Sequence, residues 1–157
     1  MKRLLACAFV SLFAVAAAFA GHPKVTLRAH LEGNEHDGEV FSTQLRSPST
    51  NKKITIQKIP AISEYDVTAF RAFPADGGTF GVLFQLNDHG RIVLDTLSVE
   101  RRGTFLYVFL NGRPAAELQI DRRITDGQLY LASGVTAADV EMMKKEWPII
   151  GAVKKRR

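Results

Sequence analysis

The stretch that decides the fold runs from Phe105 to Trp147 and reads FLYVFLNGRPAAELQIDRRITDGQLYLASGVTAADVEMMKKEW. Its pattern predicts a β-hairpin, a further strand and a closing amphipathic helix. Asn111 and Gly112 are a strong signal for a two-residue hairpin turn, because both central positions of that turn favour positive φ. No residues in the stretch have the spacing of a catalytic centre. We therefore expect it to specify architecture rather than activity.

The strands on both sides of this turn have the residue types that sheets favour. Residues 104–110 (TFLYVFL) are almost all apolar or aromatic, which predicts a central strand covered on both faces. Residues 115–120 are expected to return antiparallel to it. Asp126 and Gly127 then predict a second turn, and residues 128–132 predict a last short strand.

A helix is expected to close the fold after a break at Ser133 and Gly134. Thr136, with Asp139 three residues later, approximates a capping box, in which each residue satisfies a free backbone amide of the other. Pro148 ends the helix because proline cannot continue it. One apolar stripe of this helix contains Val140, Met143 and Trp147.

The residues before Phe105 predict further strands and one more helix. Ser63 is placed to cap a single helical turn, and a helix is expected over 90–102. Asn87 or Asp88 is its N-cap, and Gly103 is its expected stop. Runs of apolar and branched residues, several of them alternating with polar ones, predict strands at 24–31, 40–45, 53–59, 67–73 and 79–86.

These elements predict an α+β fold with a single, mostly antiparallel sheet and two helices packed on one face. We see no internal repeat and no linker that would divide the chain. Four segments are expected: a signal peptide at 1–20, N-terminal strands and loops at 21–61, an α+β region at 62–150 and a basic tail at 151–157. The two middle segments are expected to form one domain.

The start of the chain has the three parts of a secretory signal peptide. Lys2 and Arg3 form a short positive region, an apolar run follows, and AFA at 18–20 matches the small-x-small pattern that signal peptidase accepts. We therefore expect export to the periplasm or beyond the cell. The only cysteine, Cys7, lies in this segment, so the exported domain is expected to have no disulfide.

The formal net charge of +5 is concentrated at the two ends of the chain. Of 21 basic residues, two precede the apolar run and four form the terminal run 154–157, which leaves 15 against 16 acidic residues. Because this body has no basic stripe, we expect no nucleic-acid partner. The tail is interpreted as a solvated end, with weak contact to an anionic membrane surface as the alternative.

Histidines are the candidate metal ligands, and no cysteine outside the first segment joins them. The acidic loop at 32–39 contains His36 and Asp37. His22 lies near the expected mature N-terminus, where it resembles a weak copper chelator. We keep the loop and His22 as an alternative metal or small-ligand site.

No nucleophile elbow, phosphate-binding glycine loop or HExxH pair is present in the sequence. Asp121 and Asp126 flank Arg122 and Arg123, but charged residues between two strands favour a solvated surface over acid–base chemistry. We therefore expect a non-enzymatic protein without a cofactor. The aromatic residues of the strands are interpreted as core and cross-strand pairs: Phe80, Phe84, Phe105, Tyr107 and Phe109.

The order of motifs resembles the head subdomain of the first periplasmic domain of SecD, in the SecD–SecF protein-export family. Two segments carry the resemblance, GVLFQLNDHG at 81–90 and YVFLNGRPAAELQIDRRITDGQLYLASGVTAADVEMM at 107–143. Asn111 stands where the family usually has Asp, and AAEL at 115–118 replaces its Ser-Ala-Pro stretch. The other positions that fit are Leu110, Gly112, Ile120, Ile124, Thr125, Gly127, Gly134, Thr136 and Val140.

The resemblance implies an α+β fold and contact with extended or partly folded polypeptide. In that family the head is proposed to grip an emerging chain and to move with a proton-driven membrane part. We recognise no transmembrane bundle and no base subdomain here, so we do not expect a translocation motor. We expect a free-standing exported domain that binds a protein or peptide partner in the cell envelope, accepting an extended segment at an exposed sheet edge. A small-ligand or metal-binding module is the alternative, and a hydrolase ranks third.

Overall fold

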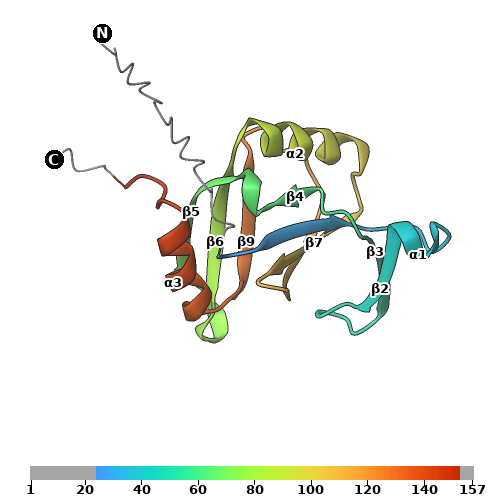
Figure 1. Ribbon diagram of the computed structural model, residues 1–157, viewed down its shortest axis with the longest axis horizontal. Coiled ribbons are helices and arrows are strands. Elements are labelled where there is room, and N and C mark those ends of the chain that lie inside the picture. Colours follow the sequence, from blue (N-terminus) through green and yellow to red (C-terminus); the bar gives the residue numbers. More distant parts are fainter. Residues whose placement is uncertain (1–23, 153–157) are drawn as a thin grey trace, which may run out of the picture.

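The computed structural model describes residues 24–152 (Figure 1). The predicted signal peptide with Cys7, His22 and residues 153–157 of the tail lie outside the described residues. In chain order the elements are β1 (Leu27–Leu31), α1 (Gly38–Phe41), β2 (Ser42–Arg46), β3 (Lys53–Gln57), β4 (Ile62–Ser63), η1 (Glu64–Asp66), β5 (Val67–Pro74), η2 (Asp76–Gly78), β6 (Phe80–Leu86), α2 (Asp88–Glu100), β7 (Phe105–Leu110), β8 (Arg113–Gln119), β9 (Gln128–Val135) and α3 (Ala137–Glu146).

The strands are distributed over three antiparallel sheets. The largest has the order β4-β1-β7-β8, the second has the order β5-β6-β9, and the third is the hairpin β2-β3. The prediction of an antiparallel α+β fold is confirmed. The prediction of a single sheet carrying two helices is wrong, because β8 and β9 are not paired with each other. A β8–β9 ladder would have joined the two larger sheets into one.

Backbone features on both strands interrupt the expected β8–β9 pairing. Pro114 in β8 has no N–H to donate, and the register of β7 against β8 shifts between Val108 and Phe109. In β9, Gly134 has a φ of +95°, and a Cβ at this position would overlap the carbonyl oxygen of Ala115. The two strands therefore touch near Gly134 without forming a ladder.

One apolar core, the main core, joins both larger sheets and the two longer helices. The three apolar residues of β1 face it, as their alternating pattern predicted. Leu94 of α2 and Met143 of α3 are buried in it. Trp147, directly after α3, makes edge contacts with Phe70 and Phe84 at ring-centroid distances of 6.5 and 6.0 Å. Each fully buried side chain of this size contributes about 1.5–3 kcal/mol.

The longer helices α2 and α3 and the turn η1 begin at caps that the sequence predicted. Asn87 is the N-cap of α2, and its side chain accepts a hydrogen bond from a first-turn amide at 2.8 Å. Thr136 and Asp139 form the reciprocal capping box of α3. Ser63 precedes the single turn η1, and its amide donates to the Asp66 carboxylate at 2.8 Å.

Two predicted strand boundaries are wrong. Val40 and Phe41 belong to α1 instead of a strand, and they are 77% and 67% exposed. Gly38, with a φ of +73°, lets the chain form a helical turn before β2 begins. Strand β9 continues through Ser133 and Gly134, where a break was predicted, because a register shift in the β6–β9 pairing accommodates two extra residues of β9.

The outer edge of β5 is covered by the segment that follows α3 (Figure 1). The Phe70 amide donates to the Pro148 carbonyl oxygen at 3.0 Å, and the Ile150 amide donates to the Phe70 carbonyl oxygen at 2.8 Å. This edge is therefore partly closed by main-chain hydrogen bonds.

Residues 38–57, which comprise α1, β2 and β3, form an arm at the end of the molecule opposite to α3 (Figure 1). The Gly33 amide, just before the arm, donates to the Thr55 carbonyl oxygen at 2.9 Å. His30 Nδ1 lies 2.8 Å from the Gln57 carbonyl oxygen. These bonds attach the arm to β1.

The tip of the arm contacts the outer face of the four-stranded sheet. Ser49 Oγ, at its tip, donates to the Glu117 carboxylate of β8. Tyr107 on this face is only 5% exposed, although it does not belong to the main core. The ring of His30 contacts the edge of Phe109 at a centroid distance of 5.5 Å. Tyr107 of this face and Ile56 of the arm are therefore both buried outside the main core.

Candidate functional site

The residues that match the SecD pattern fall at three places in the fold. Leu110 ends β7, and Asn111 and Gly112 form the turn into β8 with φ values of 51° and 75°. Both values are positive, as the hairpin prediction required. The others are Ile120, Ile124, Thr125 and Gly127 in the β8–β9 connection, Gly134 near the end of β9, Thr136 at the start of α3 and Val140 within it.

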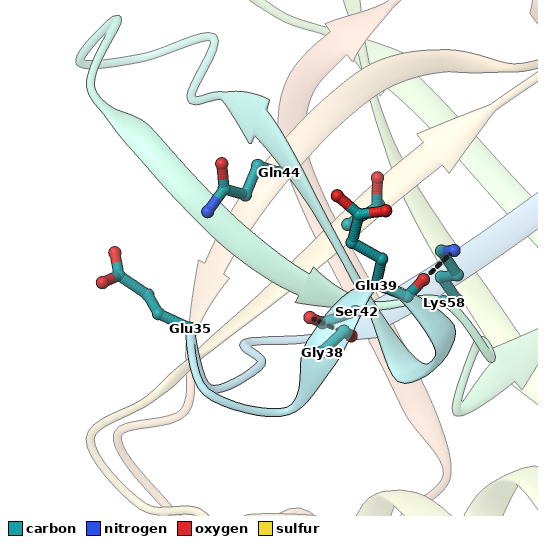
Figure 2. A pocket seen from close by; sticks show the side chains of 7 residues that line it. Glu35, Gly38, Glu39, Ser42, Gln44 and Lys58 are labelled. Atoms are coloured by element: carbon teal, nitrogen blue, oxygen red, sulfur yellow. Dashed lines mark hydrogen bonds between the residues drawn. The ribbon is translucent and has the colours of Figure 1, made fainter.

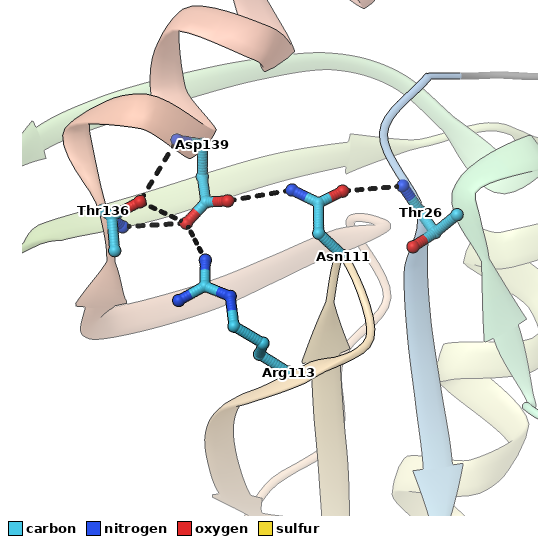
Figure 3. Close-up of polar contacts among 5 residues, drawn as sticks. All are labelled: Thr26, Asn111, Arg113, Thr136 and Asp139. Atoms are coloured by element: carbon cyan, nitrogen blue, oxygen red, sulfur yellow. Dashed lines mark hydrogen bonds and ion pairs between the residues drawn. The ribbon is translucent and has the colours of Figure 1, made fainter.

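Asn111 and Thr136 meet at one buried carboxylate, that of Asp139 (Figure 3). Asn111 Nδ2 donates to Asp139 Oδ1 at 2.8 Å, and Thr136 Oγ1 donates to Oδ2 at 2.5 Å. Arg113 Nη2 also donates to Oδ2, at 2.7 Å. On its other side, Asn111 Oδ1 accepts the Thr26 amide at 3.2 Å. These bonds fasten the β7–β8 turn to α3 and to the start of β1.

The chemistry of Asp139 is that of a structural carboxylate. Its side chain is 3% exposed. Burial alone would raise its pKa, but the hydrogen bonds from Thr136, Asn111 and Arg113 outweigh burial and hold the pKa of Asp139 below its ordinary value. Both oxygens accept hydrogen bonds within the protein. Neither is therefore free to act on a ligand.

No group of three or more metal-ligating side chains (His, Cys, Asp or Glu) comes together within residues 24–152. His36, in the acidic loop, directs Nδ1 to the side-chain oxygen of Asn34 at 3.2 Å. His89 pairs with Asp66, with Nδ1 and Oδ1 2.7 Å apart. The structure thus places His36 and His89 in contacts within the protein.

A shallow hollow of about 430 Å³ lies beside α1 and β2 (Figure 2). Its charged residues are Glu35, Glu39 and Lys58, and Lys58 Nζ donates to the Glu39 carbonyl oxygen. In Figure 2 the two carboxylates point to different sides of the hollow. The hollow includes part of the loop that the sequence suggested as an alternative site, but its charged groups do not converge on one position.

A larger groove of about 670 Å³ lies between the facing edges of β8 and β9. Each strand is the last in its sheet, so each presents main-chain groups that no neighbouring strand uses. Two open strand edges therefore face the same space. The lining residues of this β8–β9 groove are Glu117, Leu118 and Gln119 of β8, Gln128, Leu129 and Tyr130 of β9, Leu83 of β6, and the connecting residues 121–126.

The connection that lines the groove is held in place by α2. Arg123 donates from Nε and Nη2 to the two carboxylate oxygens of Asp95, at 2.6 and 3.0 Å. The Ile124 amide donates to Ser98 Oγ at 2.9 Å. Because these contacts fix both side chain and backbone, this wall of the groove is preformed.

Three charged groups in or beside the groove have a pKa shifted towards the ionised form. The Arg123 guanidinium holds the pKa of the Asp95 carboxyl below its ordinary value, and Asp95 raises the pKa of Arg123 in turn. Burial raises the pKa of Glu117, but hydrogen bonds from Ser49 and Ser47 outweigh burial and leave the pKa lowered. Glu117 Oε1 is buried without a hydrogen-bond partner.

Sequence reasoning did not find this groove. It interpreted Asp121 and Asp126 as part of a solvated surface; both are exposed, and both also line the groove. Tyr130 also lines it; this residue is 52% exposed and stacks on Phe73 at a centroid distance of 5.5 Å. Pro114 was the available signal, because proline within a sheet marks an edge strand.

No family model matches the sequence, and no curated protein matches it significantly. Two solved structures of SecDF match the fold. One, a membrane component that enhances protein export, has a TM-score of 0.53 and 14% identity, over 84% of this chain and 69% of that chain. The other, SecDF in a super-membrane-facing form, also has a TM-score of 0.53 and 14% identity, over 80% of this chain. That match spans 19% of the SecDF chain, so this chain corresponds to a small part of it. The protein thus has a SecD-like fold.

Proposed function

We propose that this protein is an exported, non-enzymatic domain that binds extended polypeptide in the cell envelope through the β8–β9 groove. The observation that carries the proposal is the pair of unpaired strand edges that face each other across the groove. An extended segment that adds to such an edge gains main-chain hydrogen bonds, which do not depend on its sequence.

The side chains of the groove suit an extended occupant. In a strand, successive side chains point to opposite sides, so every second residue of a bound segment faces the same wall. Leu118, Ile124 and Tyr130 offer apolar surface for these residues. The Arg123–Asp95 pair keeps the wall in position before binding, which lowers the ordering cost of association.

Export is supported by the signal-like N-terminal sequence and by the SecD-like fold. Within residues 24–152 no helix has the length and apolar character that a membrane crossing requires. SecDF itself enhances protein export. A binding groove would serve such a role by contacting an emerging or unfolded chain.

Titration with labelled peptides tests the proposal. A peptide of about seven residues that alternates Val and Thr should bind saturably, as measured by fluorescence anisotropy. The same peptide with alternate amides N-methylated should bind at least about tenfold more weakly, because it cannot form the strand ladder. Tyr130→Ala should weaken binding, whereas Phe41→Ala, on the arm, should not. Equal binding of both peptides would rule out strand addition.

A small-ligand site is the second candidate, and the hollow beside α1 is the observation that favours it. Calorimetry with copper, zinc and calcium separates this site from peptide binding, since only a metal site predicts stoichiometric uptake of a metal ion. Glu39→Gln should then reduce the uptake, and peptide binding should be unchanged.

A further inference from the structure

We infer that the β8–β9 groove prefers extended segments in which a basic side chain lies among apolar ones. This inference rests on the proposed function and specifies the class of segment that the groove takes. It is carried by the charge of the groove. Once Arg123, which forms an ion pair with Asp95, is set aside, acidic residues outnumber basic ones along the groove.

Five charged residues line the groove, three of them acidic and two basic. Arg123 is not free, because both oxygens of Asp95 accept its hydrogen bonds. A paired guanidinium of this kind offers little attraction to an acidic peptide. No ion pair within residues 24–152 neutralises the other four, which are three carboxylates and one guanidinium: Glu117, Asp121, Asp126 and Arg122.

Glu117 adds a second reason for the preference. Its carboxylate stays ionised, since the hydrogen bonds from Ser49 and Ser47 lower its pKa. One of its oxygens, Oε1, is buried and accepts no hydrogen bond. An ionised oxygen in this position is electrostatically uncompensated, and a cation in the adjoining groove reduces that penalty.

Apolar surface and carboxylates occur side by side in the groove, and long basic side chains suit both. Lysine and arginine pack their aliphatic stems on apolar groups while the charged end stays near solvent or an acid. Leu118, Ile124 and Tyr130 supply the surface for the stem, and Asp121 and Asp126 supply the acids. A glutamate at the same place would be repelled by these carboxylates. Of the two arginines that line the groove, only Arg122 is outside an ion pair and could attract it.

Three matched peptides test the preference. The alternating Val-Thr peptide is made with Lys, Gln or Glu at its centre, with both ends blocked, and affinities are measured at low and at high ionic strength. We expect the order Lys, Gln, Glu, with about fivefold or more between the first and the last at low salt. High salt should reduce this ratio, because these charges are partly exposed.

Variants locate the effect in the groove. Asp121→Asn and Asp126→Asn should each reduce the Lys-to-Glu affinity ratio about twofold to fivefold and leave the Gln peptide unchanged. Asp126→Asn keeps the oxygen that accepts the Gln128 amide, so the turn is retained. Asp88→Asn, an exposed change on α2, is the matched control and should leave the ratio unchanged.

The outcomes separate the two proposals. If none of the three peptides binds, the proposed function fails. If all three bind with equal affinity, strand addition stands and the preference for basic segments is wrong. A ratio that responds to Asp88→Asn as strongly as to Asp121→Asn would also overturn the preference, because the effect would then come from overall charge.

Discussion

The main core and the arm (residues 38–57) both bury apolar residues, but they are attached to the rest of the chain by different kinds of contact. Phe84 in the main core packs against Trp147 and is surrounded by both larger sheets and the helices. Ile56 in the arm is also buried, but it lies outside that core. The arm is attached mainly through hydrogen bonds, at His30 and at Glu117. Regions attached in this way open locally at a lower free energy than the global unfolding.

Removing apolar volume from the main core is expected to have the largest effect. Phe84→Ala should lower the free energy of unfolding by about 3–5 kcal/mol, because it leaves a cavity that Trp147 and the sheets cannot fill. Urea denaturation followed by circular dichroism measures the loss. The matched change Ile56→Ala should cost less globally and should increase amide exchange in the arm. Equal global losses would show that the arm is part of the main core.

Removing the carboxylate of Asp139 ranks next. Asp139→Ala should cost about 2–3 kcal/mol, since it removes the carboxylate half of the α3 capping box and leaves Asn111 and Arg113 without their acceptor. The folded-state pKa of Asp139 lies below its ordinary 3.8, so its contribution is complete above that pH and is lost as the pH falls through the folded value. Acid titration of stability should show this loss in the wild type and not in the variant. Glu141→Gln, an exposed change on the same helix, is the control and should cost no more than about 0.5 kcal/mol.

Acid should loosen the arm through His30, with a smaller effect. Burial lowers the pKa of His30 below its ordinary 6.5, the bond to the Gln57 carbonyl opposes this, and nearby Arg28 adds to the lowering. The unfolded state therefore takes up the proton first, and stability falls as the pH decreases from 6.5 towards the folded pKa. The protection factor of the Gly33 amide, which bonds to Thr55, should decrease between about pH 7.5 and about pH 5.5. His30→Gln should abolish that decrease, and an unchanged slope would assign it to another group.

The smallest effect is expected at two exposed apolar residues, one in the arm and one just after it. Phe41→Ser and Ile59→Ser should each change the free energy of unfolding by no more than about 0.5 kcal/mol, because both side chains are exposed. The same denaturation measurement checks this. A larger loss would mean that these residues support the arm from outside.

Sequence reasoning succeeded where local chemistry decides the structure. Asn111 and Gly112 form the predicted turn, and Asn87, Ser63 and Thr136 lie at the predicted helix starts. A turn or a cap depends on a few adjacent residues, so its signal is contained in the sequence near it.

Sequence reasoning failed where contacts between residues far apart in the chain decide the structure. Whether β8 pairs with β9 depends on Ala115 and Gly134, which are far apart in the chain. Arg123 of the β8–β9 connection is neutralised by Asp95, which belongs to α2 and lies far from it in the sequence. Because no short pattern encodes these contacts, neither the groove nor its charge balance was predicted.

The arrangement of the strand edges has a consequence for which proteins the molecule engages. In the two larger sheets, β4 has two residues and β5 is partly covered at Phe70 by the segment after α3, whereas β8 and β9 are longer edges with no such cover. These two line the same groove. Under the proposed function the groove would take one extended chain, whereas a folded sheet would have to bring its neighbouring strands with it. We therefore expect the protein to discriminate between unfolded and folded partners.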